Sequence, residues 1–93
     1  MRKLVDIQKA EQEFFDKVWY DRSQMLVSNI LEGNSEMPPE EIADNAGLAR
    51  SKIETKYGKK NLGPYSEFEW GMINGKLSAL RWILGDEWDF LDT

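Results

Sequence analysis

The sequence contains no cysteine and no histidine, and it has only three prolines among 93 residues. Without cysteine there is no disulfide, no thiolate nucleophile and no zinc–thiolate site. Without histidine the chain lacks the side chain most often used as a general base and as a transition-metal ligand. Any chemistry would depend on carboxylates, lysine, tyrosine or a hard metal such as magnesium. We therefore expect no catalytic residue, no cofactor and no metal site.

Long apolar runs are also missing. No run reaches the roughly 20 apolar residues that cross a bilayer, and charges interrupt residues 1–13, so these do not resemble a signal peptide. We expect no membrane contact and a cytoplasmic protein. The length predicts a single helical domain over residues 1–93, near the lower limit for burying a sufficient core alone, so that a second copy would help.

Basic charge is scarce and unevenly placed. The net charge of −5 argues against nucleic acid as a partner. Residues 50–60 nevertheless carry five basic side chains and one acidic one, so the remainder of the chain is more acidic than the total suggests.

A first helix is predicted for residues 3–32, which have no proline or glycine and repeat apolar side chains at helical spacing. Glu11 and Arg22 lie within its apolar arc, too far apart to pair along one helix. In an antiparallel pair of first helices they would face each other between two copies and help to set a homodimer register. The alternative is that each extends to solvent or pairs within its own chain.

A second helix is predicted for residues 39–57, because proline and two glutamates suit a first turn and Gly58 suits the end. The same residues also fit a helix-turn-helix over residues 39–58, with its turn at Gly47. Its second segment would present a DNA-binding set: Arg50, Ser51, Lys52 and Lys56. Lys56 counts against this alternative, because the motif usually has an apolar residue there.

A third helix is predicted for residues 66–84, since Ser66 and Glu69 form a capping box and Gly85 follows. It has two apolar faces, which is typical of a helix held between two neighbours. The second face gives the candidate partner interface, which comprises Phe68, Gly71, Met72, Gly75, Ala79 and Trp82, with Glu11 and Arg22 for the first-helix contact. A short helical turn is expected from Asp86, with Trp88 and Leu91 folding back.

The run NLGPYSEFEWGMINGKLSALRWILGDEWDFLDT, with Val18–Arg22 upstream, resembles a group of small uncharacterised proteins of bacteria and their phages, cyanophages among them. The likeness is dense from residue 57 onward and thin between residues 34 and 50. It implies an uninterrupted helical middle segment and carries no activity with it.

An enzymatic alternative comes from two carboxylate pairs, Glu13-x-x-Asp16 and Glu41-x-x-Asp44. They resemble the paired acids with which all-α nucleotide pyrophosphohydrolases hold magnesium, although the first pair departs from that pattern. Magnesium needs converging oxygens, and these four would converge only if both solvated helix faces turned inward.

Together these observations predict an all-α protein of three main helices plus a short C-terminal turn, arranged as a dimeric helical bundle. We expect a non-enzymatic interaction or accessory protein that acts as a homodimer, with a further protein as a second kind of partner. A helix-turn-helix regulator and a magnesium-dependent pyrophosphohydrolase are the alternatives.

Overall fold

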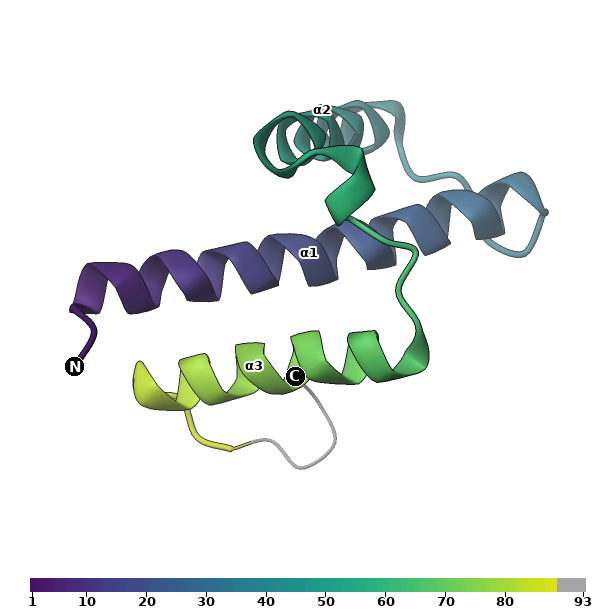
Figure 1. Ribbon diagram of the computed structural model, residues 1–93. Coiled ribbons are helices and arrows are strands. Elements are labelled where there is room, and N and C mark those ends of the chain that lie inside the picture. Colours follow the sequence, from purple (N-terminus) through teal and green to yellow (C-terminus); the bar gives the residue numbers. More distant parts are fainter. Residues whose placement is uncertain (89–93) are drawn as a thin grey trace. The chain divides into compact units, whose positions relative to one another are not determined.

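A computed structural model gives the arrangement of residues 1–88, the part of the chain that is described below. It contains three α-helices, α1 (Leu4–Leu31), α2 (Glu40–Tyr57) and α3 (Glu67–Ile83), and one short 3-10 helix, η1 (Lys59–Asn61) (Figure 1). Residues 1–88 contain no strand, so the predicted all-α fold is confirmed. The helix ends differ from the predicted ones by at most one residue, which is within the usual uncertainty at a helix terminus.

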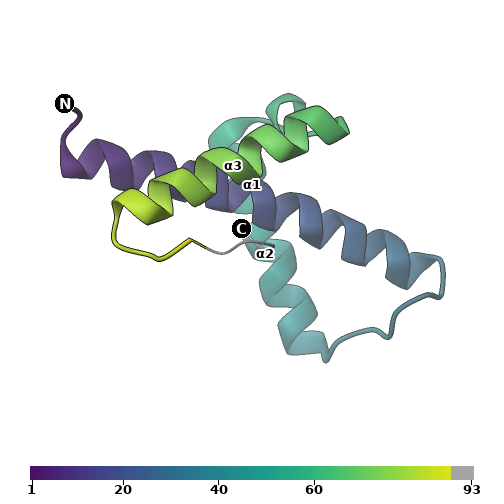
Figure 2. The same cartoon turned by 90° about the horizontal axis from the view of Figure 1, so that it is seen from below.

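The chain divides into two compact units, and α1 runs through both. The first unit holds residues 1–18 together with the described part of the segment that begins at Tyr65, and the second holds Trp19–Pro64. Within the first unit the segment of α1 runs antiparallel to α3, and within the second unit α2 crosses the segment of α1 at a steep angle (Figures 1 and 2). The single domain expected from the sequence stays a prediction.

The end of α1 is a glycine cap, as the sequence predicts. Gly33 has a φ of 80° and donates its N–H to the carbonyl of Ile30 at 3.1 Å. Asn34 donates to the carbonyl of Asn29 at 2.8 Å. This pair of bonds is the Schellman arrangement, which satisfies the last carbonyls of a helix where glycine can adopt a positive φ.

The middle segment is one continuous helix, as predicted for residues 39–57, and the alternative with a turn at Gly47 is wrong. Gly47 lies inside α2 with helical neighbours on both sides. A Cβ at this position would meet only the Arg50 guanidinium, at an ordinary 3.6 Å, so the residue fits the helix interior like any other. The helix ends at Gly58, where φ is 83°, because a left-handed residue stops helical hydrogen bonding there.

The start of α3 is the predicted capping box. The Ser66 hydroxyl accepts a hydrogen bond from the Glu69 N–H at 3.1 Å, and the Glu69 carboxylate accepts one from the Ser66 N–H at 2.9 Å. The hydrogen bond from the Ser66 backbone N–H lowers the pKa of Glu69 because it stabilises the charged carboxylate. The helix therefore begins at a fixed residue, which sets the direction of every side chain that follows.

Beyond α3, the structure shows part of what the sequence predicts. Residues 86–88 form no helix, and the remainder of the expected terminal turn lies outside the described residues. Trp88 does fold back, since its ring stacks on that of Trp82 with centroids 5.4 Å apart and planes 12° apart.

Candidate functional site

One face of α3 stays exposed although it is apolar. Phe68 is 76% exposed, Trp82 50% and Met72 45%. On the other side of the same helix Leu77 is 1% exposed. The two-faced character predicted from the sequence is therefore present, and within the first unit only one of the two faces is covered.

This face is hollowed along its length. A groove of about 510 Å³ follows the helix and is lined by Glu67, Phe68, Gly71, Met72, Gly75, Lys76 and Ala79. Five of these seven residues belong to the interface predicted from the sequence. Trp82, a sixth member of that predicted set, lies further along α3, where it stacks on Trp88.

The two glycines explain the hollow. A Cβ built on Gly71 or on Gly75 would meet no neighbouring atom within 4 Å, so packing inside the described unit does not require glycine at either position. Each glycine inside a helix costs about 1 kcal/mol relative to alanine. Two glycines one helical turn apart, each with this cost, point to a contact that the single chain does not make.

The covered side of α3 is held against α1 by charged and aromatic side chains of the first unit. Arg81 forms an ion pair with Glu11, with Nε and Oε1 3.3 Å apart, and its guanidinium lies 5.5 Å from the centre of the Phe15 ring. Lys76 lies at the border between the two sides: it lines the groove, and its ammonium lies 5.6 Å from the centre of the Phe14 ring. These contacts fix which side of α3 faces α1 and leave the groove side outward.

Glu11 forms an ion pair with Arg81 of its own chain, which agrees with the second of the two sequence-based interpretations; the contact between Glu11 and Arg22 of two copies stays a prediction. Arg22 is exposed on α1. An ion pair between Glu11 and Arg22 of two copies would have to replace the contact with Arg81, so we leave both residues out of the proposed interface.

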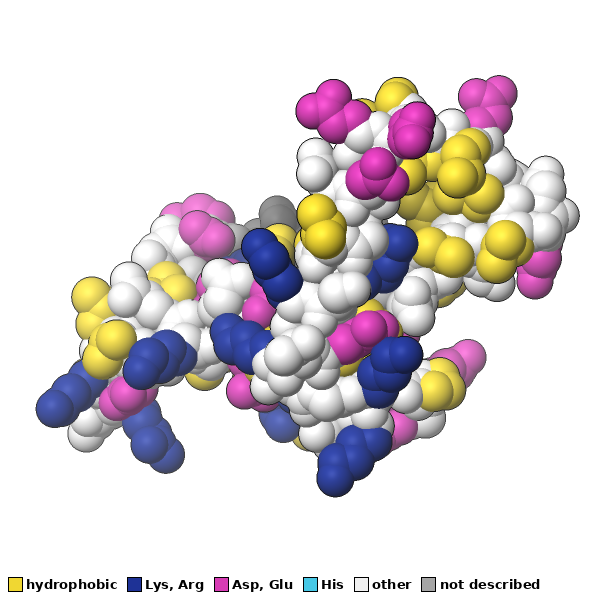
Figure 3. Space-filling view, turned by 90° about the horizontal axis from the view of Figure 1, so that it is seen from above, with side chains coloured by type: hydrophobic (Ala, Val, Ile, Leu, Met, Phe, Trp, Pro, Cys, Tyr) yellow, Lys and Arg dark blue, Asp and Glu magenta, His cyan; other side chains and the backbone are white. Residues whose placement is uncertain are grey.

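A second apolar groove lies in the other unit, and the sequence did not predict it. Figure 3 shows apolar side chains gathered where the end of α1 meets the start of α2. The groove has a volume of about 290 Å³ and is lined by Ser23, Leu26, Val27, Ile30, Leu31, Met37, Pro38, Ile42, Ala43, Ala46 and Arg50. The broad apolar arc of the first helix was a signal for it, but the partner segment could not be named from periodicity.

A polar cavity of about 300 Å³ in the same unit is built around Tyr20. The Tyr20 hydroxyl donates a hydrogen bond to Glu54 at 2.6 Å and accepts one from Gln24 at 3.3 Å. Burial, together with Glu54, raises the pKa of Tyr20 to about 12. The phenol is therefore protonated at neutral pH and serves as a donor that joins α1 to α2. Burial also raises the pKa of Asp21, which lines the same cavity.

The basic residues proposed for nucleic acid are divided between two roles. Arg50 donates a hydrogen bond to the Ser23 hydroxyl at 2.8 Å and is half-buried against α1. Ser51 and Lys52 are exposed on α2, and the Lys56 ammonium lies 5.2 Å from the centre of the Tyr57 ring. Arg50, the first residue of the proposed DNA-binding set, is thus engaged in a contact between α1 and α2.

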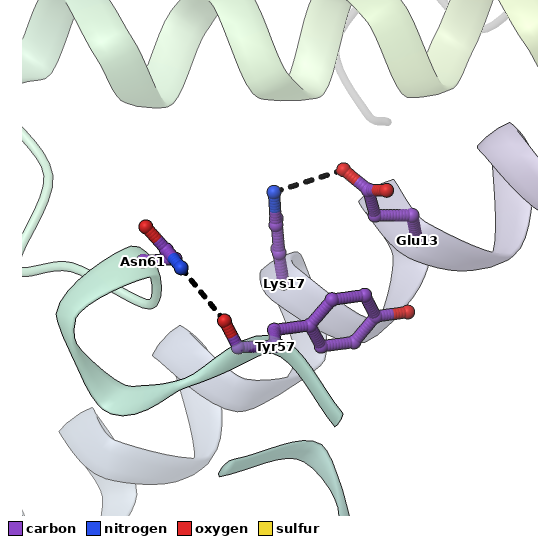
Figure 4. Close-up of polar contacts among 4 residues, drawn as sticks. All are labelled: Glu13, Lys17, Tyr57 and Asn61. Atoms are coloured by element: carbon purple, nitrogen blue, oxygen red, sulfur yellow. Dashed lines mark hydrogen bonds and ion pairs between the residues drawn. The ribbon is translucent and has the colours of Figure 1, made fainter. Parts of the chain in front are cut away.

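The first carboxylate pair is engaged along α1. Glu13 forms an ion pair with Lys17 at 2.9 Å, and Asp16 accepts a hydrogen bond from Gln12 at 2.7 Å. Figure 4 shows the first of these contacts; it also shows a bond within the second unit, from the Asn61 amide to the Tyr57 carbonyl at 2.7 Å. Glu41 and Asp44, the second pair, are exposed on α2. Within residues 1–88 no three acidic side chains gather in a way that could hold a metal ion.

Comparison with family models, with curated proteins and with solved structures found no match to this chain. The resemblance to small bacterial and phage proteins stays a prediction. Among the described residues, no helix combines the length and the apolar character needed to span a membrane.

Proposed function

We propose that this chain is a small helical interaction module that works as a homodimer and uses the exposed face of α3 as its contact surface. The observation that carries the proposal is the outward apolar face itself, with Phe68, Met72 and Trp82 each about half exposed or more. Contiguous exposed apolar surface of this kind marks contact sites in proteins that are otherwise polar outside.

The chemistry of the face suits contact. Its lining contains one acid, Glu67, and one base, Lys76, and is otherwise apolar or glycine. Covering apolar surface stabilises an assembly by about 25 cal/mol for each Å² removed from water. A second copy is the simplest cover, because a two-fold dimer uses the same surface on both subunits.

Sedimentation velocity over a concentration series tests the proposal. We expect the apparent mass to rise from that of the 10.8 kDa chain towards twice that value as the protein concentration increases. A protein that sediments as a monomer at every concentration up to about 200 µM, where even weak dimers are populated, would contradict the proposal.

A matched pair of variants shows whether the α3 face is responsible. Phe68→Ala removes an exposed apolar side chain from the face, and Leu48→Ala removes one of similar exposure, 63%, from α2. Both positions are exposed, so neither change should unfold the chain. We expect Phe68→Ala to weaken the dimer and Leu48→Ala to leave it unchanged; equal effects would place the contact elsewhere.

A further inference from the structure

The exposed face of α3 carries a ridge beside a groove. Side chains four residues apart form inclined rows on a helix. One row consists of Phe68, Met72 and Lys76, all exposed and all large. The adjacent row consists of Gly71, Gly75 and Ala79, the smallest residues available. The ridge stands out by whole side chains, whereas the neighbouring row exposes backbone.

The two rows match each other in spacing. Phe68 stands three residues before Gly71, and Met72 stands three residues before Gly75, so each large side chain lies beside a glycine on the same helix face. A second helix with the same pattern could insert its large row into the small row of the first. The fit would be reciprocal, because each copy offers both a ridge and a groove.

We propose that α3 of a second copy crosses this face, so that the Phe68–Met72 ridge of each chain fills the Gly71–Gly75 groove of the other. This inference rests on the homodimer proposed above and adds the register and the direction of crossing. Helices that interlock through rows of this kind cross at about −50°. Glycine in the groove lets the two backbones approach closely, as in other close helix pairs.

The direction of the pair follows from symmetry. A two-fold axis that runs along the rows places the ridge of each copy over the groove of the other, with Phe68 of one chain over Gly71 of its mate and Met72 over Gly75. An axis across the rows would place ridge on ridge and groove on groove. The two α3 helices therefore cross with their N-terminal ends on the same side.

Charge permits a second copy at this face more readily than at the rest of the surface. The chain has a net charge of −5, so two copies repel each other over most of their surface. The groove lining is the exception, because Glu67 and Lys76 balance each other there. Two copies can thus meet through this face without bringing excess acid into contact.

The area also suits a dimer. Aromatic side chains present roughly 150–250 Å² each, so the exposed fractions of Phe68 and Trp82 supply on the order of 250 Å² of apolar surface per chain. A comparable amount comes from Met72, Ile83, the backbone of the two glycines and the residues that border the groove. The sum of about 500 Å² per partner, or about 1,000 Å² in total, reaches the lower limit of a specific interface.

The decisive experiment places a large side chain in the groove. Gly75→Leu has open space around it in the single chain, so the fold tolerates it. Leucine adds apolar surface, and a dimer held by unspecific apolar contact would become tighter. A ridge seated in the groove would instead be expelled, and overpacking of this kind should raise the dimer Kd by about 10- to 100-fold. Gly47→Leu, inside α2, is the matched control and should leave Kd unchanged.

The outcomes separate this inference from the proposal beneath it. A wild-type chain that stays monomeric overturns both and leaves the face to a different protein. A wild-type dimer whose Kd is unchanged or lowered by Gly75→Leu overturns only the register. The register is supported if Gly75→Leu raises the dimer Kd and Gly47→Leu leaves the Kd unchanged.

Because the chain has no cysteine, introduced thiols report the direction of crossing. Copies with Met72→Cys are mixed with copies with Gly75→Cys and oxidised, and the mixed disulfide is identified by its mass. Disulfides require Cα atoms about 4.4–6.8 Å apart. The proposed register places positions 72 and 75 of the two copies opposite each other, so this pair should cross-link most readily. Ser51→Cys mixed with Lys52→Cys, both exposed on α2, measures random collision. A 72–75 yield no higher than that control overturns the proposed direction.

Discussion

At the scale of single residues, Tyr20 shows how one polar contact joins two helices of the second unit. Its side chain is 5% exposed, and its hydroxyl donates to Glu54 at 2.6 Å. A buried hydroxyl without a partner would destabilise the fold by about 1–3 kcal/mol. Glu54 accepts this hydrogen bond, and the phenol must remain protonated to donate it.

This requirement makes stability depend on pH in the alkaline range. Tyr20 has its ordinary pKa of 10.0 when unfolded and a pKa of about 12 when folded. Between these values the unfolded state binds fewer protons, so the free energy of unfolding falls as pH rises. The full contribution of Tyr20 to the free energy of unfolding is present below pH 10. It is lost as the pH rises from 10 through 12, a change of about 2–3 kcal/mol.

Urea denaturation between pH 8 and about 12 measures this loss. Tyr20→Phe is the control, because phenylalanine cannot titrate; the other tyrosines and lysines then contribute equally to both proteins. We expect the difference in unfolding free energy between the two proteins to shrink as pH rises. A difference that stays constant across the range would show that Tyr20 does not titrate as the contact with Glu54 requires.

At the scale of elements, α3 depends on its N-terminal cap. Ser66→Ala removes the acceptor for the Glu69 N–H and should lower the free energy of unfolding by about 0.5–2 kcal/mol. The lowered pKa of Glu69 adds a pH dependence with the opposite sign from that of Tyr20, because this contribution is present above the ordinary pKa of glutamate and is lost on acidification.

Thermal or urea unfolding measures the cost of the lost cap. Ser51→Ala is the matched control, since Ser51 is an exposed serine inside α2, where alanine is the better helix former. That variant should be as stable as the wild type or slightly more stable. If the two variants unfold at the same midpoint, the capping box contributes nothing to α3.

The elements were predictable from the sequence because their signals are local. The capping box at Ser66, the glycine at position 33 and the two faces of α3 each depend on residues a few positions apart. The choice between one helix and two around Gly47 was not local, since glycine suits both a turn and a tolerant helix interior. It is decided in favour of one helix, α2.

Contacts between elements could not be predicted in the same way. Glu11 pairs with Arg81, seventy residues away along the chain, and Tyr20 with Glu54. Nothing in the spacing of either pair distinguishes it from other acid–base or acid–phenol pairs in a chain with 31% charged residues. The groove beside Met37 and Ile42 could not be predicted for the same reason, because it depends on which helix segments meet.

At the scale of the whole molecule, the small covered area of each unit accounts for the exposed apolar faces. A pair of helical segments covers one stripe on each helix and leaves other apolar positions outward. In the first unit Leu77 is fully buried, while Phe68, Trp82 and Ile83 are half exposed or more. Short chains bury a smaller fraction of their surface than long ones, and association is a common remedy.

Salt distinguishes the two dimers that this chain could form. A dimer built on Glu11 and Arg22 would be held by opposite charges and would weaken as salt screens them. The α3 dimer brings together neutral faces of two chains that each carry −5, so salt should relieve their repulsion. Screening also leaves the apolar contact intact.

We therefore expect the dimer Kd to fall by about threefold when sodium chloride rises from about 50 to 500 mM, since the Debye length then shrinks from over 10 Å to under 5 Å. Sedimentation at both salt concentrations measures the shift, and Phe68→Ala should show a higher Kd at each. A Kd that rises with salt would favour an interface of opposite charges, because only such an interface loses attraction when charges are screened.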